Sequence, residues 1–146
     1  MLASAIFAFL HFLSAFGLVS TVILERVLFK PNLSAGEVKR LAKIDGFYGL
    51  SAITVLIVGF LRVFYFEKGS AFYFSNPMFH IKLTVFIIIG LLSIYPTVKL
   101  LKWGKTKEEV NIDSTIYKKI IRVLNIELGL LVLLLFFASL MSRVII

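Results

Sequence analysis

The sequence predicts an all-α integral membrane protein, a four-helix up-down-up-down bundle that forms a single transmembrane domain over residues 1–146. Hydrophobic residues make up 60% of the 146-residue chain, and the mean hydropathy is +0.98, well outside the range of soluble proteins. The apolar residues form four continuous segments, each near or above the ~20 residues that a helix needs to cross the hydrocarbon of a bilayer. Their continuity excludes a β-barrel, whose strands are short and alternate in polarity. The segments cover residues 3–24, 44–66, 78–101 and 120–141.

Positive charge is concentrated in two of the three connections between these segments. The chain has 16 lysines and arginines and a formal net charge of +8. Twelve of them lie in or beside the first and third connections, which predicts that both connections are cytoplasmic and that both termini are outside. A basic surface at one membrane face favours anionic headgroups and argues against a nucleic-acid partner. The twelve are Arg26, Lys30, Lys39, Arg40, Lys43, Lys99, Lys102, Lys105, Lys107, Lys118, Lys119 and Arg122.

The first apolar segment carries a polar stripe along one helical face. No lysine or arginine precedes the segment, so it lacks the charged start of a secretion signal, and we expect a retained helix. Lipid cannot hydrogen-bond polar side chains, so the stripe should point at the other helices. Its members are His11, Ser14, Leu18, Thr21 and Glu25.

The first connection contains a helix start. Ser34, followed three residues later by Glu37, matches a capping box. We therefore expect a short amphipathic helix over residues 35–43 that can continue directly into the second membrane helix.

The second apolar segment has a face of small residues. Asp45, Ala52 and Gly59 are spaced by sevens, and such a face lets a neighbouring helix or a flat ligand approach the backbone. Helix packing alone also explains this pattern. Arg62 lies close to the outer end of the same segment.

The third apolar segment places two basic residues just inside its start. His80 and Lys82 are costly inside a membrane and should face the bundle interior, a cavity or the interface. Two residues correspond to about 200° around a helix, so the two side chains should point to different faces. We expect Lys82 to face a site and His80 to lie near the surface.

Three carboxylates belong to the inner half of the bundle. Glu25 and Asp45 lie near the inner ends of the first two helices, and Glu127 lies about two turns into the fourth. Glu25 is expected to pair with Arg26 or a nearby lysine, and Asp45 to cap the second helix, while the role of Glu127 stays open. The chain has no cysteine, which excludes thiolate ligands and disulfides.

The outer half of the bundle contains a candidate haem site. Counted from the outer end at about 1.5 Å per residue, His11 lies ~12 Å along its helix and Lys82 ~6–8 Å along its own. His11 is the natural axial ligand to iron, Lys82 can bind iron as the neutral amine, and Arg62 can clamp a propionate. Structural packing of His11 and snorkelling of the two cations are the alternative explanation.

Motifs from three of the helices resemble a bacterial family of four-helix membrane proteins of unknown function. These motifs are His11, Asp45-x-x-Tyr48-Gly49, Gly59-x-x-Arg62, Lys82 and Ser93-x-x-Pro96-Thr97. That family is similar to the membrane protoporphyrinogen IX oxidase and, more distantly, to the copper-resistance D membrane proteins. The stretch Phe79-His80-Ile81-Lys82-Leu83 resembles the third-helix motif of the oxidase. The resemblance implies that His11 and Lys82 are linked to a b-type haem.

Several functions follow from these observations. The leading hypothesis is a multi-pass protein of the bacterial inner (cytoplasmic) membrane that binds haem b and has a redox or electron-transfer role, with quinone or a porphyrin as partner. One alternative is an enzyme resembling the protoporphyrinogen oxidase. Another is a small anion or metal transport or binding protein that uses the same basic residues, and a structural or homo-oligomeric subunit completes the set.

Overall fold

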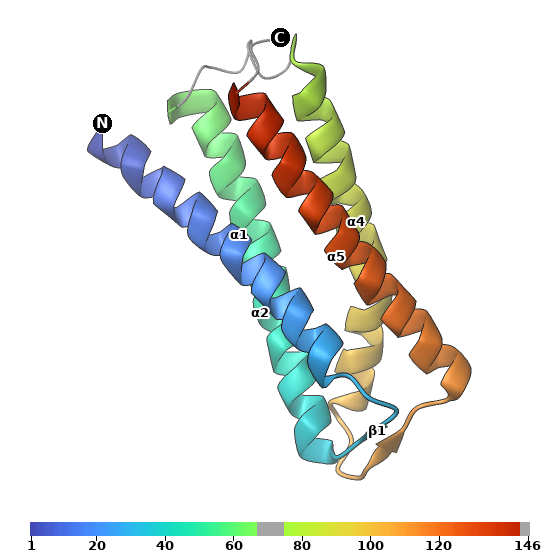
Figure 1. The fold of residues 1–146 in the computed structure, drawn as a ribbon. Helices are drawn as coiled ribbons and strands as arrows, with labels where there is room; N and C mark the ends of the chain where they lie inside the picture. The colour runs from blue at the N-terminus through green and yellow to red at the C-terminus, as the bar shows by residue number, and fades with distance from the viewer. Residues whose placement is uncertain (67–74, 144–146) are drawn as a thin grey trace.

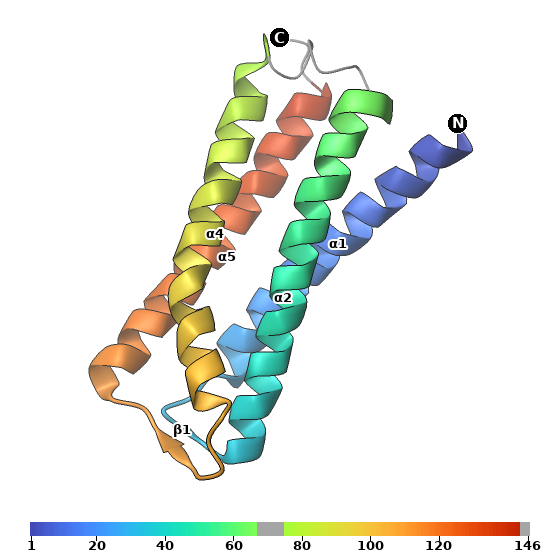
Figure 2. The same ribbon diagram turned by 180° about the vertical axis from the view of Figure 1, so that it is seen from behind.

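The computed structural model describes residues 1–66 and 75–143 as a bundle of long helices (Figure 1). Each helix runs antiparallel to the one before it, so the start of α1 and the end of α5 lie at one end of the bundle. Two short strands lie at the other end (Figures 1 and 2). The elements in chain order are α1 (Leu2–Leu28), β1 (Asn32–Leu33), α2 (Ala35–Leu61), η1 (Arg62–Phe66), α4 (Pro77–Trp103), β2 (Val110–Asn111) and α5 (Ser114–Arg143).

The predicted all-α membrane bundle is confirmed. Four of the described helices are long and apolar enough to cross a bilayer. Their outward faces carry large exposed hydrophobic side chains, such as Phe16, Leu50 and Phe136, whose exposure is favourable in lipid. The helix pairs α1–α2 and α4–α5 make the most extensive packing contacts.

The polar stripe of α1 faces the bundle interior, as its spacing predicted. Ser14, Leu18, Thr21 and Glu25 are all buried. The hydroxyls of Ser14 and Thr21 donate to backbone carbonyls one turn earlier in the same helix, at 2.8 Å. These two hydroxyls are therefore satisfied without a ligand or a neighbouring helix.

The predicted capping box is also confirmed, and it sets the start of α2. The Glu37 N–H donates to Ser34 Oγ at 3.2 Å, and the Ser34 N–H donates to Glu37 Oε1 at 3.0 Å. Lys30 adds an ion pair to Glu37 at 2.6 Å. No break separates residues 35–43 from the membrane-spanning part, so α2 is one helix from Ala35 to Leu61.

A small antiparallel ladder joins the first and third connections, a feature with no counterpart in the sequence pattern. Asn32 pairs with Asn111, and Leu33 pairs with Val110. The Ile112 N–H extends the contact by donating to the carbonyl of Pro31 at 2.8 Å. The two helical hairpins are therefore tied together at this end, which we call the connection end.

The bundle interior is layered along its axis. An apolar layer at the connection end is topped by three buried carboxyls, then by a central apolar layer, and finally by a cavity near the termini. The connection-end layer consists of Phe29, Leu33, Val38, Leu41, Leu100, Ile112, Ile120 and Leu124. The central layer consists of Leu18, Val22, Tyr48, Ile89 and Leu131. The order follows from the residue numbers, since each helix meets the layers in the same succession.

Candidate functional site

A cavity at the termini end of the bundle is the first candidate site. Its volume is about 620 Å³, within the range of small-molecule and cofactor pockets, and side chains from α1, α2, α4 and α5 line it. The predicted site residues His11, Arg62 and Lys82 all line this one cavity. Most of the remaining lining is apolar and includes Ala15, Val55, Phe60, Phe79, Phe86 and Leu131.

His11 reaches the cavity from α1 across a glycine of α2. A Cβ atom added to Gly59 would lie 3.4 Å from His11 Cε1, so the absence of a side chain at this position lets the imidazole sit close to the α2 backbone. His11 Nδ1 is buried and makes no hydrogen bond of standard geometry among the described residues, although the imidazole lies near the backbone carbonyl of Val55. A buried ring nitrogen without a partner costs about 1–3 kcal/mol, which a ligand at this position would relieve.

Arg62 enters the cavity from a π-helical turn. It is the first residue of η1, and its N–H donates to the carbonyls of Val58 and Gly59 at the end of α2. Its guanidinium carbon lies 5.9 Å from the ring centroid of Phe12 on α1, within cation–π range. π-Helical turns are frequent at functional sites, and this one has no signature that sequence periodicity can reveal.

Lys82 is half-buried on α4 and completes a basic cavity wall. Both Arg62 and Lys82 lie close enough to His11 to act on it electrostatically. No aspartate or glutamate is among the described residues that line the cavity. Like charges repel more strongly away from water, so this lining favours a guest with negative charge.

His80 lies on a different face of α4 from Lys82. Its side chain is exposed and does not line the cavity. Its backbone carbonyl accepts a hydrogen bond from the Thr84 hydroxyl at 2.8 Å, within the helix. His80 therefore provides a natural comparison for His11, because the two histidines of the chain occupy opposite environments.

The three inner carboxyls form a second group, which we call the carboxyl layer. Glu25, Asp45 and Glu127 are 2%, 5% and 1% exposed, and they come from α1, α2 and α5. The predicted pairing of Glu25 with Arg26 or a nearby lysine is wrong, because Glu25 makes no salt bridge among the described residues, and Arg26 Nε donates to Asn125 Oδ1 at 2.8 Å. The predicted cap at Asp45 is also wrong, because α2 begins at Ala35 and leaves Asp45 in its interior.

One protein-family model matches nearly the entire chain. The model of the predicted membrane protein family DUF2214 matches residues 3–145. This chain is a DUF2214 protein. Neither a curated protein nor a solved structure matches it. The family description names a membrane protein and no activity.

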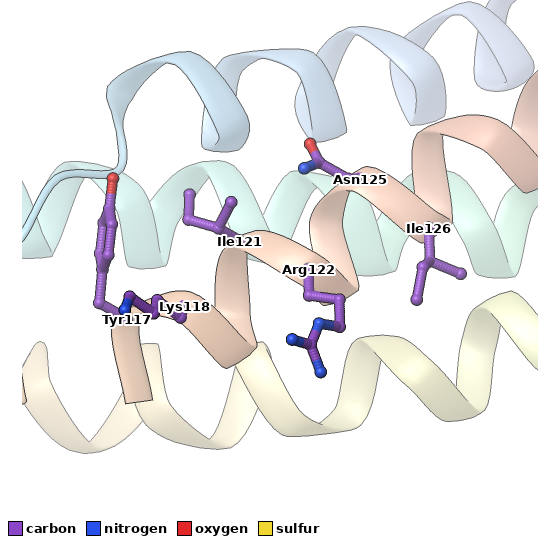
Figure 3. A pocket seen from close by; sticks show the side chains of 6 residues that line it. All are labelled: Tyr117, Lys118, Ile121, Arg122, Asn125 and Ile126. Carbon is purple, nitrogen blue, oxygen red and sulfur yellow. The ribbon is translucent and has the colours of Figure 1, made fainter. Parts of the chain in front are cut away.

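An open groove on the outer face of α5 is the third feature of the DUF2214 protein (Figure 3). It measures about 420 Å³ and lies near the connection end. In Figure 3 Tyr117 and Asn125 point toward α1, and Arg122 points the other way. Lys118 and Arg122 are exposed cations, and no carboxylate is among the described lining residues. The groove lining consists of Tyr117, Lys118, Ile121, Arg122, Asn125 and Ile126.

Proposed function

We propose that this DUF2214 protein binds haem b in the cavity at the termini end and has a redox or electron-transfer role in the bacterial inner membrane. One observation carries the proposal. His11, Arg62 and Lys82 come from separate elements of the bundle, yet they line one largely apolar cavity of about 620 Å³. Small-residue packing and axial side chains from facing helices are how helical bundles hold haem.

The donor set suits haem better than a bare metal ion. Within residues 1–66 and 75–143, no three His, Asp or Glu side chains are grouped so that they could hold a metal ion. Haem brings the porphyrin nitrogens itself and needs only one or two axial side chains. His11, whose buried Nδ1 lies beside Gly59 and makes no hydrogen bond of standard geometry among the described residues, is the candidate ligand to the iron.

The two cations have separate roles in this proposal. Lys82 would supply a second ligand to the iron through its neutral amine. Arg62 holds a propionate, because a guanidinium binds a carboxylate through two parallel hydrogen bonds. The propionates would also bring negative charge to a cavity wall that has basic residues and no described carboxylate. When bound, haem supplies one-electron redox chemistry, and these residues hold and orient it.

The distribution of charge supports an orientation with the connection end in the cytoplasm and both termini outside. The basic connections gather at that end, as the positive-inside rule requires of cytoplasmic loops. The α5 groove then lies near the cytoplasmic headgroups, where Lys118 and Arg122 favour anionic lipid. The haem cavity lies in the outer half, where it can exchange electrons with quinone or a periplasmic partner.

The absorption spectrum of the purified protein tests the proposal. The protein should be expressed with ample haem, solubilised in mild detergent and examined for a Soret band and its haem-to-protein ratio. We expect a Soret band in the wild type, its loss in His11→Ala, and no change in the matched control His80→Ala. A wild-type protein without a Soret band would contradict the proposal, and so would a His11→Ala spectrum identical to that of the wild type.

The basic lining also favours a second candidate function, binding or transport of a small anion. The observation behind it is the same cavity wall, which has three basic residues and no described carboxylate. Uptake of an anion into liposomes that is lost in Arg62→Ala, but does not depend on haem, would favour this function over the first.

A further inference from the structure

The carboxyl layer brings together three acidic side chains that the proposed haem function does not use. The Glu25 and Asp45 carboxyls lie within hydrogen-bonding reach of each other. Glu127 interacts electrostatically with both of them from α5. Among the described residues, the Tyr48 phenol on α2 also interacts electrostatically with all three carboxyls, and it lies within hydrogen-bonding reach of Ser93 on α4.

Two oxygen atoms of the carboxyl layer are buried without a hydrogen-bond partner among the described residues. Glu127 is 1% exposed, and its Oε1 atom is buried without a hydrogen-bond partner among the described residues. Glu25 Oε1 is in the same condition. Two buried acceptor atoms that point into one layer from different helices require something that donates to them.

The surroundings restrict what that donor can be. The connection-end layer and the central apolar layer enclose the carboxyls from both sides along the bundle axis. None of the three makes a salt bridge to a lysine or arginine in the described part of the chain. The described residues also contain no group of three acidic or histidine side chains able to hold a metal ion. Within residues 1–66 and 75–143, neither a cationic side chain nor a metal-binding group therefore compensates the charge of these carboxyls.

Hydrogen-bond chemistry indicates that a proton bound to one of the carboxyls can act as the required donor. An ionised carboxylate can only accept hydrogen bonds, so Glu25 and Asp45 can bond to each other only when one of them is protonated. Two like charges at this separation in an apolar interior cannot both persist, and an isolated buried charge is very costly. Protonation removes charge and supplies donors for the orphaned acceptors.

We propose that Glu25, Asp45 and Glu127 form a membrane-buried proton-binding site that holds at least one shared proton at neutral pH. The bound proton links α1 to α2 through the Glu25–Asp45 hydrogen bond, and Glu127 brings α5 into the same network. The proposal does not depend on haem, because the central apolar layer separates this site from the cavity.

Infrared spectroscopy of the whole detergent-solubilised protein tests the proposal. A protonated carboxyl has a C=O stretch distinct from the carboxylate bands, and it shifts in D₂O. We expect this band in the wild type at neutral pH and its loss in the triple variant Glu25→Gln, Asp45→Asn, Glu127→Gln. The matched control is the triple variant Glu108→Gln, Glu109→Gln, Asp113→Asn, which changes three exposed carboxyls and should leave the band in place.

Two results would overturn the proposal. One is a triple variant that removes only carboxylate absorption from the wild-type spectrum. The other is thermal stabilisation of the wild type by sodium, potassium or calcium chloride over choline chloride that the triple variant abolishes, since this would assign the site to a cation. If the triple variant does not fold, Glu25→Gln and Glu127→Gln are measured singly, and each should weaken or shift the band. None of these results bears on the Soret band.

Discussion

The cavity and the carboxyl layer are two regions of one bundle that handle buried ionisable groups in opposite ways. Each gathers three such residues from different elements. In the cavity they are basic, partly exposed and arranged around a hollow of about 620 Å³. In the carboxyl layer they are acidic and no more than 5% exposed, and they interact with one another electrostatically. The cavity is suited to a guest that compensates its charge, whereas no described lysine or arginine forms a salt bridge with the carboxyl layer.

The central apolar layer keeps the two regions apart. Along α1, His11 and Glu25 are separated by about 21 Å at ~1.5 Å per residue, with Leu18 and Val22 between them. Changes at sites this distant usually act additively. A variant in one region is therefore expected to leave the other region unchanged.

The largest expected effect comes from a change in the separating layer itself. Ile89 is 1% exposed, so Ile89→Ala should leave a void and lower the free energy of unfolding by about 2–5 kcal/mol. Thermal denaturation in detergent measures this loss. The exposed neighbour Ile88, changed to Ala, is the control and should cost far less.

Loss of the cavity histidine should affect haem alone. His11→Ala is expected to weaken haem binding at least tenfold, which corresponds to about 1.4 kcal/mol, and so to lower the haem-to-protein ratio, while the protonated-carboxyl band stays unchanged. A coupled change in that infrared band would show that the two regions are not independent.

Gly59 offers a finer test of how the imidazole is positioned. A side chain here would meet His11 Cε1, so Gly59→Leu should displace the ring, shift the Soret band and weaken haem retention severalfold. Gly49→Leu on the same helix is the matched control, because a Cβ there meets nothing within 4 Å. Equal effects of both variants would argue for a general defect in α2 instead of a local clash.

The smallest effect on the cavity and on the carboxyl layer is expected from a change at the start of α2. Ser34→Ala removes the side-chain half of the capping box and should destabilise the protein by about 0.5–2 kcal/mol. Haem content and the infrared band should not change, because the lost hydrogen bond lies at the connection end. Thermal denaturation, alongside the exposed control Ser114→Ala, measures the difference.

Much of the fold follows from local patterns that a single sequence contains. The spacing of Ser14, Leu18, Thr21 and Glu25 predicted the buried face of α1, because burial follows the 3.6-residue period. Ser34 and Glu37 predicted the cap because its chemistry is local. Depth arithmetic also predicted which ionisable residues share each half of the bundle.

The remaining features depend on contacts between segments that are distant in sequence. The π-helical turn at Arg62 has no periodic signature, and two-residue strands are too short to produce one. The predicted partner of Glu25 was wrong because the prediction relied on the neighbouring cation Arg26, which is adjacent in sequence. Arg26 instead reaches Asn125 on α5, a contact that only the packed bundle defines.

The β1–β2 ladder has a mechanical consequence for the cavity. It clasps the two helical hairpins at the connection end, next to the apolar layer that packs them there. At the other end α1 diverges from its neighbours in both views (Figures 1 and 2). The helices are therefore held together at the connection end, and α1 is splayed from them at the end that contains the cavity. Because the ladder holds only one end of the bundle, a given tilt of α1 would change the width of the cavity more than it would change the packing at the connection end.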